Sequence, residues 1–124
     1  MNKKIYKVQF YDGTNNNHYY VVSDINAIFE RKFDYKEKIV ELLDDKFIGT
    51  CEEHEHDKKL FYVTLSSDDS FYIIANNMKD AYKLLCINVG DYIRFFNSIE
   101  YIAPIQYIRS FNEIHDDIES LRIG

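Results

Sequence analysis

The order of elements is set by KIYKVQF (residues 4–10), a stretch that recurs as KLFYVTL (residues 59–65). YYVVSD (residues 19–24) corresponds to FYIIAN (residues 71–76), which comes at the same place in the second copy. A repeat of this kind indicates one supersecondary unit used twice. Further along, apolar residues recur at a constant separation of 54, in the pairs Ile39 and Ile93, Leu42 and Phe96, Phe47 and Tyr101, and Ile48 and Ile102.

Each copy is expected to be a β-β-α-(α)-β unit. Alternating apolar and polar residues over 4–11 predict a half-buried strand, and 18–22 predict its return strand after a polar turn. Ser23 and Asp24 can cap a short helix, because hydroxyl and carboxylate oxygens accept the free N–H groups of a helix start. A second helical segment is predicted at about 35–43, and a third strand at 47–51.

The second copy is predicted to follow the same order. Asn76 or Asn77 caps its helix, a helical segment lies near 91–96, and a strand runs from 99 to 108. Pro104 has no N–H for a ladder, so it predicts a bulge or an edge. Ser110 and Glu113 form a capping box that predicts a C-terminal helix over 110–122.

The expected fold class is therefore α+β, with an antiparallel sheet or sheets, helices packed on one face and a closing C-terminal helix. A unit of about 60 residues buries too little surface to fold alone with ease. We thus expect residues 1–124 to form a single domain built from two repeats, about 4–51 and 59–104, plus the helix.

Charge and composition exclude several classes of function. The chain has 124 residues and a formal net charge of −6, which argues against direct binding of nucleic acid or of an anionic membrane, since both require clustered Lys and Arg. No apolar signal core follows the basic start, and no run approaches the length of a membrane span. Cys51 and Cys86 are the only cysteines. These features predict a cytoplasmic protein with reduced thiols.

One cluster has the residue types of a metal site: Cys51, His54 and His56. A structural zinc site uses four ligands, commonly as two close pairs, and no second pair is present. We therefore expect a solvated loop, with no metal and no cofactor. Nucleophile elbows and glycine-rich phosphate loops are absent from the sequence. The sequence predicts no catalytic residue and no enzymatic activity.

The strands are rich in aromatic residues, which allows two interpretations. They could form a stacking platform for nucleic-acid bases, or they could fill a core that lacks Trp. The scarcity of Lys and Arg favours the core. These residues are Tyr6, Phe10, Tyr19, Phe61, Tyr72 and Tyr101.

Acidic side chains are the candidate partner-binding groups. They fall in the joint between the copies and in the second hairpin turn: Glu52, Glu53, Glu55, Asp57, Asp68 and Asp69. If equivalent loops gather at one end, they form an acidic rim that could meet a basic cleft, with electrostatic complementarity guiding association. The alternative is that the charge serves solubility.

In size, acidity, Asn/Lys/Tyr/Ile-rich composition and lack of catalytic motifs, the chain resembles small accessory proteins of phages and mobile elements, including anti-CRISPR and other anti-defence inhibitors. The resemblance implies a non-catalytic inhibitor or regulator of a host protein, such as a nucleic-acid-processing enzyme with a basic surface. Two alternatives stay open: a small-ligand or nucleotide-sequestering protein, and an enzyme dependent on a metal or on Cys/His chemistry. A homodimer formed through an exposed edge strand is also possible.

Overall fold

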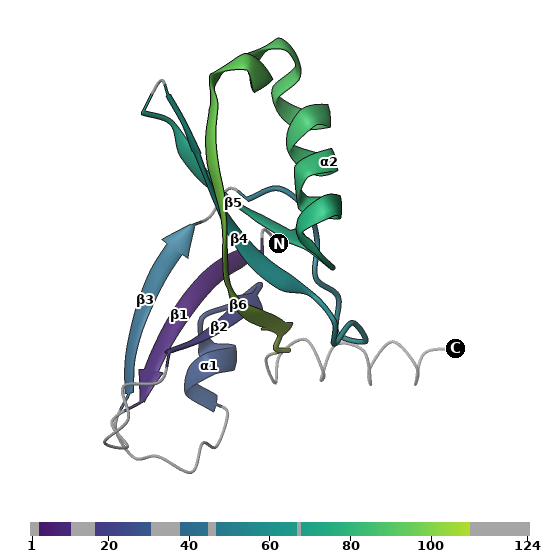
Figure 1. Cartoon of the computed structure of the whole chain (residues 1–124). Helices are drawn as coiled ribbons and strands as arrows, with labels where there is room; N and C mark the ends of the chain where they lie inside the picture. The colour runs from purple at the N-terminus through teal and green to yellow at the C-terminus, as the bar shows by residue number, and fades with distance from the viewer. Residues whose placement is uncertain (1–2, 11–16, 31–37, 45–46, 67, 110–124) are drawn as a thin grey trace.

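The structure, a computed structural model, describes residues 3–10, 17–30, 38–44, 47–66 and 68–109 (Figure 1). It is an α+β fold composed mostly of sheet. The predicted C-terminal helix over 110–122 lies outside the described residues. The elements in chain order are β1 (Lys4–Phe10), β2 (Asn17–Val22), α1 (Asn26–Glu30), β3 (Lys38–Asp44), β4 (Lys59–Leu65), β5 (Ser70–Ala75), α2 (Met78–Val89), η1 (Gly90–Phe95) and β6 (Phe96–Tyr107).

The six strands form one sheet in the order β3-β1-β2-β6-β4-β5. Four of the strand pairs are antiparallel, but β2 and β6 run parallel, with Tyr19 opposite Ile105 and Val21 opposite Tyr107. The expectation of a purely antiparallel sheet was therefore wrong. A parallel pair requires a long connection, and here β2 and β6 are separated by most of the chain.

This order contains two sets of three strands (triplets), β3-β1-β2 and β6-β4-β5, with the same arrangement. In each set, the strand that comes first in the sequence is central, with the second strand on one side and the third on the other. In each triplet the register shifts between the second and third residues of the central strand, Ile5/Tyr6 in β1 and Leu60/Phe61 in β4. The extra residue is Leu43 in β3 and Ile102 in β6, so each third strand carries a bulge at the corresponding place.

Two segments pair with strands of the other half: the end of β6 pairs with β2, and Ile48 pairs with β5. From Lys59 to Leu65, β4 pairs with β6 residues 96–104, and the last residues of β6, 105–107, pair with β2. The bond from the Ile108 N–H to the Val21 carbonyl, 3.1 Å, continues this contact. In the opposite direction, Ile48 after β3 bridges in parallel to Ile73 of β5. Each half thus supplies a strand partner to the other.

Pro104 marks the point where β6 changes partner. It is the last β6 residue opposite β4, and Ile105 is the first opposite β2. The sequence predicted a bulge or an edge at Pro104, because proline cannot donate to a ladder, but the bulge in this part of β6 lies at Ile102. The edge alternative does not apply to the end of β6, which lies between β2 and β4 in the sheet order.

Two predictions for the first half were wrong. Residues 38–44 form strand β3 rather than part of a helix, and in the predicted strand 47–51 the structure has only the bridge at Ile48. Both faces of this strand carry apolar residues, and their spacing resembles the apolar stripe of a helix: Ile39, Val40, Leu42 and Leu43. Pairing with β1 makes the segment a strand nevertheless.

The prediction that equivalent residues of the two copies lie 54 positions apart was also wrong in this region. Leu42 lies opposite the third residue of β1, and Tyr101, rather than Phe96, lies opposite the third residue of β4. Ile93, the expected counterpart of Ile39, lies in η1. Among the described residues, the helices of the second half are longer, since α2 and η1 together run from Met78 to Phe95 and α1 runs from Asn26 to Glu30.

The helices begin where the sequence predicts. Asp24 Oδ1 accepts from the Asn26 N–H at 3.0 Å before α1, and Asn77 Oδ1 accepts from the Asp80 N–H at 2.8 Å before α2. Such side-chain caps satisfy the free N–H groups of a first turn. Gly90, with φ +56°, ends α2 and leads into η1. None of the helices among the described residues is long and apolar enough to cross a bilayer.

The apolar interior consists of three clusters. The first joins β1 and β2 to Ala27 and Ile28 of α1, and the second joins β4 and β5 to Ala81 and Leu85 of α2. The third lies on the other face of the strands and combines both halves: Ile5, Val21, Cys51, Leu60, Ile74 and Ile105. Figure 1 shows α2 lying along the sheet of the second half. Because the third cluster is shared, packing of either half depends on residues of the other.

Candidate functional site

The joint between the halves holds four of the six predicted partner-binding acids, and three of these are paired within the chain. Glu52 contacts Lys3 at 3.0 Å, Glu53 contacts Arg109 at 3.2 Å, and Glu55 contacts Lys58 at 3.3 Å. Asp57 is exposed, and its carbonyl accepts from Lys59 Nζ at 3.4 Å. We call residues 51–58 the linker. Its ion pairs are partly exposed, and most of its carboxylates are balanced by a neighbouring Lys or Arg side chain.

Glu55 also closes the turn in which it lies. Its carboxylate accepts from the Glu52 N–H at 3.0 Å, and the Glu55 N–H donates to the Glu52 carbonyl at 3.0 Å. The hydrogen bond that the carboxylate accepts from the Glu52 N–H is the main reason that the pKa of Glu55 lies below its ordinary value. The neighbouring Lys58 adds to the effect. This carboxylate has a structural task in addition to its charge.

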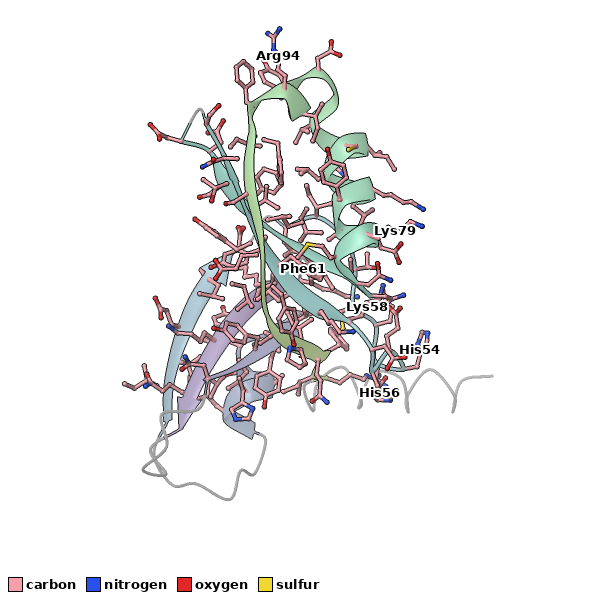
Figure 2. The ribbon with its side chains drawn as sticks, viewed as in Figure 1. His54, His56, Lys58, Phe61, Lys79 and Arg94 are labelled. Atoms are coloured by element: carbon pink, nitrogen blue, oxygen red, sulfur yellow. The ribbon has the colours of Figure 1, made fainter. Side chains whose placement is uncertain are left out.

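The structure separates the three residues of the candidate metal cluster. Cys51 is fully buried, with Sγ 4.0 Å from the Ile105 carbonyl, whereas His54 and His56 are exposed. Figure 2 shows both histidines on the outer side of the linker. Burial raises the pKa of the Cys51 thiol and disfavours the thiolate that zinc binds. In the part of the chain that the structure describes, no three His, Cys, Asp or Glu side chains are placed to share a metal ion.

Asp68 and Asp69 lie at the far end of β4 from the linker. Residues 52–57 precede β4 and 68–69 follow it, and the strand spans about 20 Å at roughly 3.3 Å per residue. Figure 2 places Arg94 of η1 at one end of this half and His54 and His56 at the other. The six predicted residues therefore lie in two separate groups and do not form one rim.

A hollow of about 600 Å³ opens beside Asp69. One wall is the β4–β5 hairpin end, with Asp69, Ser70 and Phe71, and the other is the end of α2 with Asn88, followed by Tyr92 of η1. Tyr92 is 66% exposed, an unusual degree for a large aromatic residue. We call this feature the tip hollow. It combines a carboxylate with two aromatic side chains and an amide.

Backbone hydrogen bonds hold the two walls of the tip hollow together. The Ser66 N–H donates to the Phe95 carbonyl at 2.7 Å, which ties the hairpin end to η1. Within the hairpin, the Leu65 N–H donates to the Asp69 carbonyl at 2.9 Å, and Asp68 adopts φ +67°, a left-handed conformation that Asp tolerates better than most residues. The shape of the hollow therefore follows from backbone bonds as well as from side-chain packing.

Two further cavities lie along the sheet. One of about 440 Å³ is bordered by Gly49, Lys58, Asp80 and Lys83, between the linker and α2. The other, of about 320 Å³, lies where β2 and β6 diverge and is lined by His18, Tyr19, Pro104 and Gln106 among others.

The strand aromatics are divided between the core and the surface. Tyr6 is 8% exposed and Phe61 2%, and each faces a helix. Tyr72 stacks beside Tyr62, with ring centroids 5.1 Å apart, and its partial burial raises the pKa of the Tyr72 hydroxyl. Tyr101 remains 47% exposed against the edge of Phe61. Tyr19 and Tyr72 pack against the third cluster, and the side chain of Phe10 lies outside the described residues.

Comparison of the chain with protein-family models, with curated proteins and with solved structures found no match in any of the three.

Sequence reasoning singled out Asp69 of the tip hollow but missed its other residues. Phe71, Asn88 and Tyr92 come from three elements, β5, α2 and η1, which are brought together by the packing of α2 along the sheet. Tyr92 carried one available signal, because it follows Gly90 and Asp91 at the end of a helical stretch, where an aromatic side chain has no core to enter.

Proposed function

We propose that the chain is a non-catalytic binding protein that inhibits or regulates a protein partner, and that the tip hollow accepts a basic side chain of that partner. One observation carries the proposal: Asp69, Phe71 and Tyr92 line a single open hollow. A guanidinium group can pair with a carboxylate while it stacks on an aromatic face, and such desolvated aromatic and charged contacts dominate protein interfaces.

Arg94 gives a local example of the same chemistry. Its guanidinium carbon lies 4.9 Å from the centroid of the Phe95 ring, and the Phe95 and Tyr92 ring centroids are 6.1 Å apart. An incoming arginine in the tip hollow would meet aromatic faces of the same kind, with Asp69 supplying the carboxylate. The net charge of −6 favours a partner with a basic surface and steers its approach. A nucleic-acid-processing enzyme, as in the phage inhibitors that the chain resembles, offers such a surface.

The linker acids have a separate role in this proposal. Glu52, Glu53 and Glu55 are engaged by Lys3, Arg109 and Lys58, so a partner would have to compete with these contacts. Asp57 and the second carboxylate oxygen of Glu53, whose side chain is 61% exposed, remain accessible and extend the acidic field. Their effect would be on the association rate, since exposed charges act mainly through long-range attraction.

Capture of the partner tests the proposed function. The wild-type chain, immobilised as bait in a lysate of its host, is expected to retain one protein with a basic surface. Asp69→Asn and Tyr92→Ala should each lower the affinity for the purified partner about tenfold or more. Asp57→Asn is the matched control, an exposed aspartate at the other end of β4, and should change the affinity less than threefold or so. Equal affinity for all four baits would contradict the tip hollow as the binding site.

A small anionic ligand is the second candidate. The cavity of about 440 Å³ places Lys58 and Lys83 on one opening, next to Thr50 and the first turn of α2. Titration with nucleotides, followed through the amide signals of Thr50 and Lys83, distinguishes this activity from protein binding. Nucleotide binding that survives Asp69→Asn and is lost in Lys83→Ala would favour the ligand-binding function.

We also propose that the two halves are copies of one ββαβ unit. The shared strand order and the corresponding bulges support this, and so do three positions that are half-exposed and apolar in both halves. Ile25 and Met78 each follow a capping residue directly, Phe29 and Tyr82 lie four residues further on, and Leu42 and Tyr101 lie opposite the third residue of the central strand. Their exposed fractions are 37% and 42%, 55% and 42%, and 49% and 47%, respectively.

A further inference from the structure

The outer side of β3 is a strand edge without a strand beside it among the described residues. β3 ends the sheet order, and its one neighbour is β1. Figure 1 shows it at the left margin of the molecule. Unpaired N–H and C=O groups along such an edge are a template for another strand.

The other outer edge is treated differently. β5 is covered at its centre by Ile48, which accepts from the Ile74 N–H at 2.8 Å and donates to the Tyr72 carbonyl at 3.0 Å. The first part of β6 is also open on one side, but it carries Asn97, Ser98 and Glu100, all exposed and polar. Polar and charged side chains are the usual means of preventing edge pairing. β3 therefore stands out among the edges.

β3 has charged residues at its ends, Lys38 and Asp44, and at its centre, Glu41, but apolar side chains are exposed between them. Ile39 is 47% exposed on one face and Leu42 is 49% exposed on the other, so apolar surface flanks the open backbone on both sides. The charge at the centre of the strand, Glu41, is engaged by Lys7 of β1 at 3.1 Å. Val40, opposite Val8, packs against the first core cluster.

We propose that two copies of the chain associate by antiparallel pairing of β3 with β3, with Val40 on the two-fold axis. Two conditions decide between the registers centred near the middle of β3, at Val40 or at Glu41. Residues opposite each other in an antiparallel pair share a face, so the axis must lie between the two copies of one residue. A centre at Glu41 would bring two carboxylates together, which is unfavourable, whereas a centre at Val40 places Ile39 opposite Glu41 of the second copy.

This register makes an apolar row continuous across the axis. On the face of the first core cluster, the order would be Val8, Val40, then Val40 and Val8 of the second copy. Leu42 lies on the same face, and Phe29 of the neighbouring α1 is 55% exposed. A seven-residue edge with these side chains is smaller than the interfaces of stable complexes, which bury about 1,200–2,000 Å². We therefore expect a weak dimer with a dissociation constant in the micromolar range.

The proposal is tested by sedimentation and by a cysteine across the axis. The wild-type chain should shift from monomer to dimer as its concentration rises through the micromolar range. Leu42→Lys should keep it monomeric, because a charge is placed on the edge, whereas Ile87→Lys should not change association. Ile87 is the matched control, an apolar residue that is 78% exposed on α2.

The cysteine test fixes the register. At a two-fold axis between antiparallel strands, opposite Cα atoms lie about 4.5–5.5 Å apart, within the range of a disulfide. In a chain with Cys86→Ala, oxidation should therefore link Val40→Cys to itself. Leu42→Cys should not link, since its Cα atoms would be displaced by roughly 14 Å along the strands. A wild-type chain that stays monomeric, a dimer that Leu42→Lys leaves intact, or a dimer not linked by Val40→Cys would each overturn the proposal.

Discussion

Cys51 and Glu55 lie four residues apart in the linker but meet opposite environments. The thiol is buried in the core that both halves share, and burial raises its pKa. The carboxylate is near the surface, and a backbone N–H lowers its pKa. The sequence presented both as parts of one polar loop. The difference arises because Cys51 contacts Ile105 of β6, which is 54 residues away in the sequence. A pattern of neighbouring residues could not predict that contact.

A single substitution at Glu55 tests the structural task of the linker. Glu55 has a folded-state pKa below that of the unfolded chain, so its contribution to stability is present above the ordinary glutamate pKa and is lost as pH falls through the lower, folded value. Glu55→Gln should therefore lower the free energy of unfolding at neutral pH and match the wild type in more acidic solution.

Urea denaturation at a series of pH values measures this effect. Glu53→Gln is the control, because its contact with Arg109 is an exposed ion pair and should contribute little. A Glu55→Gln effect that stayed constant from neutral to acidic pH would show that the loss is not electrostatic.

At the scale of elements, prediction succeeded where a pattern is local. The first hairpin, both helix caps, α2 and the end of β6 follow from alternation, capping residues and proline, all of which act over a few residues. It failed at β3 and at the sheet order, because the partner of a strand is decided by distant residues. Of the candidate site, the sequence could identify Asp68 and Asp69 as exposed turn acids, but the facing wall with Tyr92 depends on how α2 packs.

The segment that bridges to β5 depends on Gly49. This residue has φ +93°, and a Cβ built there would lie 2.1 Å from the Ile74 carbonyl oxygen. Gly49→Ala should therefore destabilise the fold by about 3 kcal/mol or more, through both backbone strain and steric overlap. The bridge at Ile48 would be the first contact to be lost.

Gly90 provides a matched comparison. It also has a positive φ, +56°, but a Cβ there meets nothing within 4 Å. With ψ −125°, its conformation is one that other residues rarely adopt, so Gly90→Ala should cost about 1–3 kcal/mol from the backbone alone. Denaturation midpoints of the two variants measure the difference, and equal losses would show that the approach to Ile74 is not a constraint.

At the scale of the whole molecule, the two halves exchange segments, and we expect this exchange to make them fold and unfold together. Residues 105–108 complete the first half, and Ile48 contacts the second. We expect a chain ending at residue 58 to be unfolded, because it lacks Ile105 and Ile108 from two of its core clusters. Adding residues 59–124 should restore structure.

Amide spectra of the two fragments, separately and mixed, test this expectation. Dispersed signals should be seen only in the mixture, and they should resemble those of the intact chain. A first fragment that gave a dispersed spectrum alone would show that the halves are independent domains, and the shared cluster would then have little energetic weight.

The parallel pairing of β2 with β6 also has a consequence during synthesis on the ribosome. Tyr19 meets Ile105 only after 86 further residues have been added, which takes roughly 4–17 s at about 5–20 residues per second. Throughout that interval β2 cannot gain the neighbour that β6 supplies. A ribosome that stalls before β6 is translated would therefore release a chain in which β2 has no such partner.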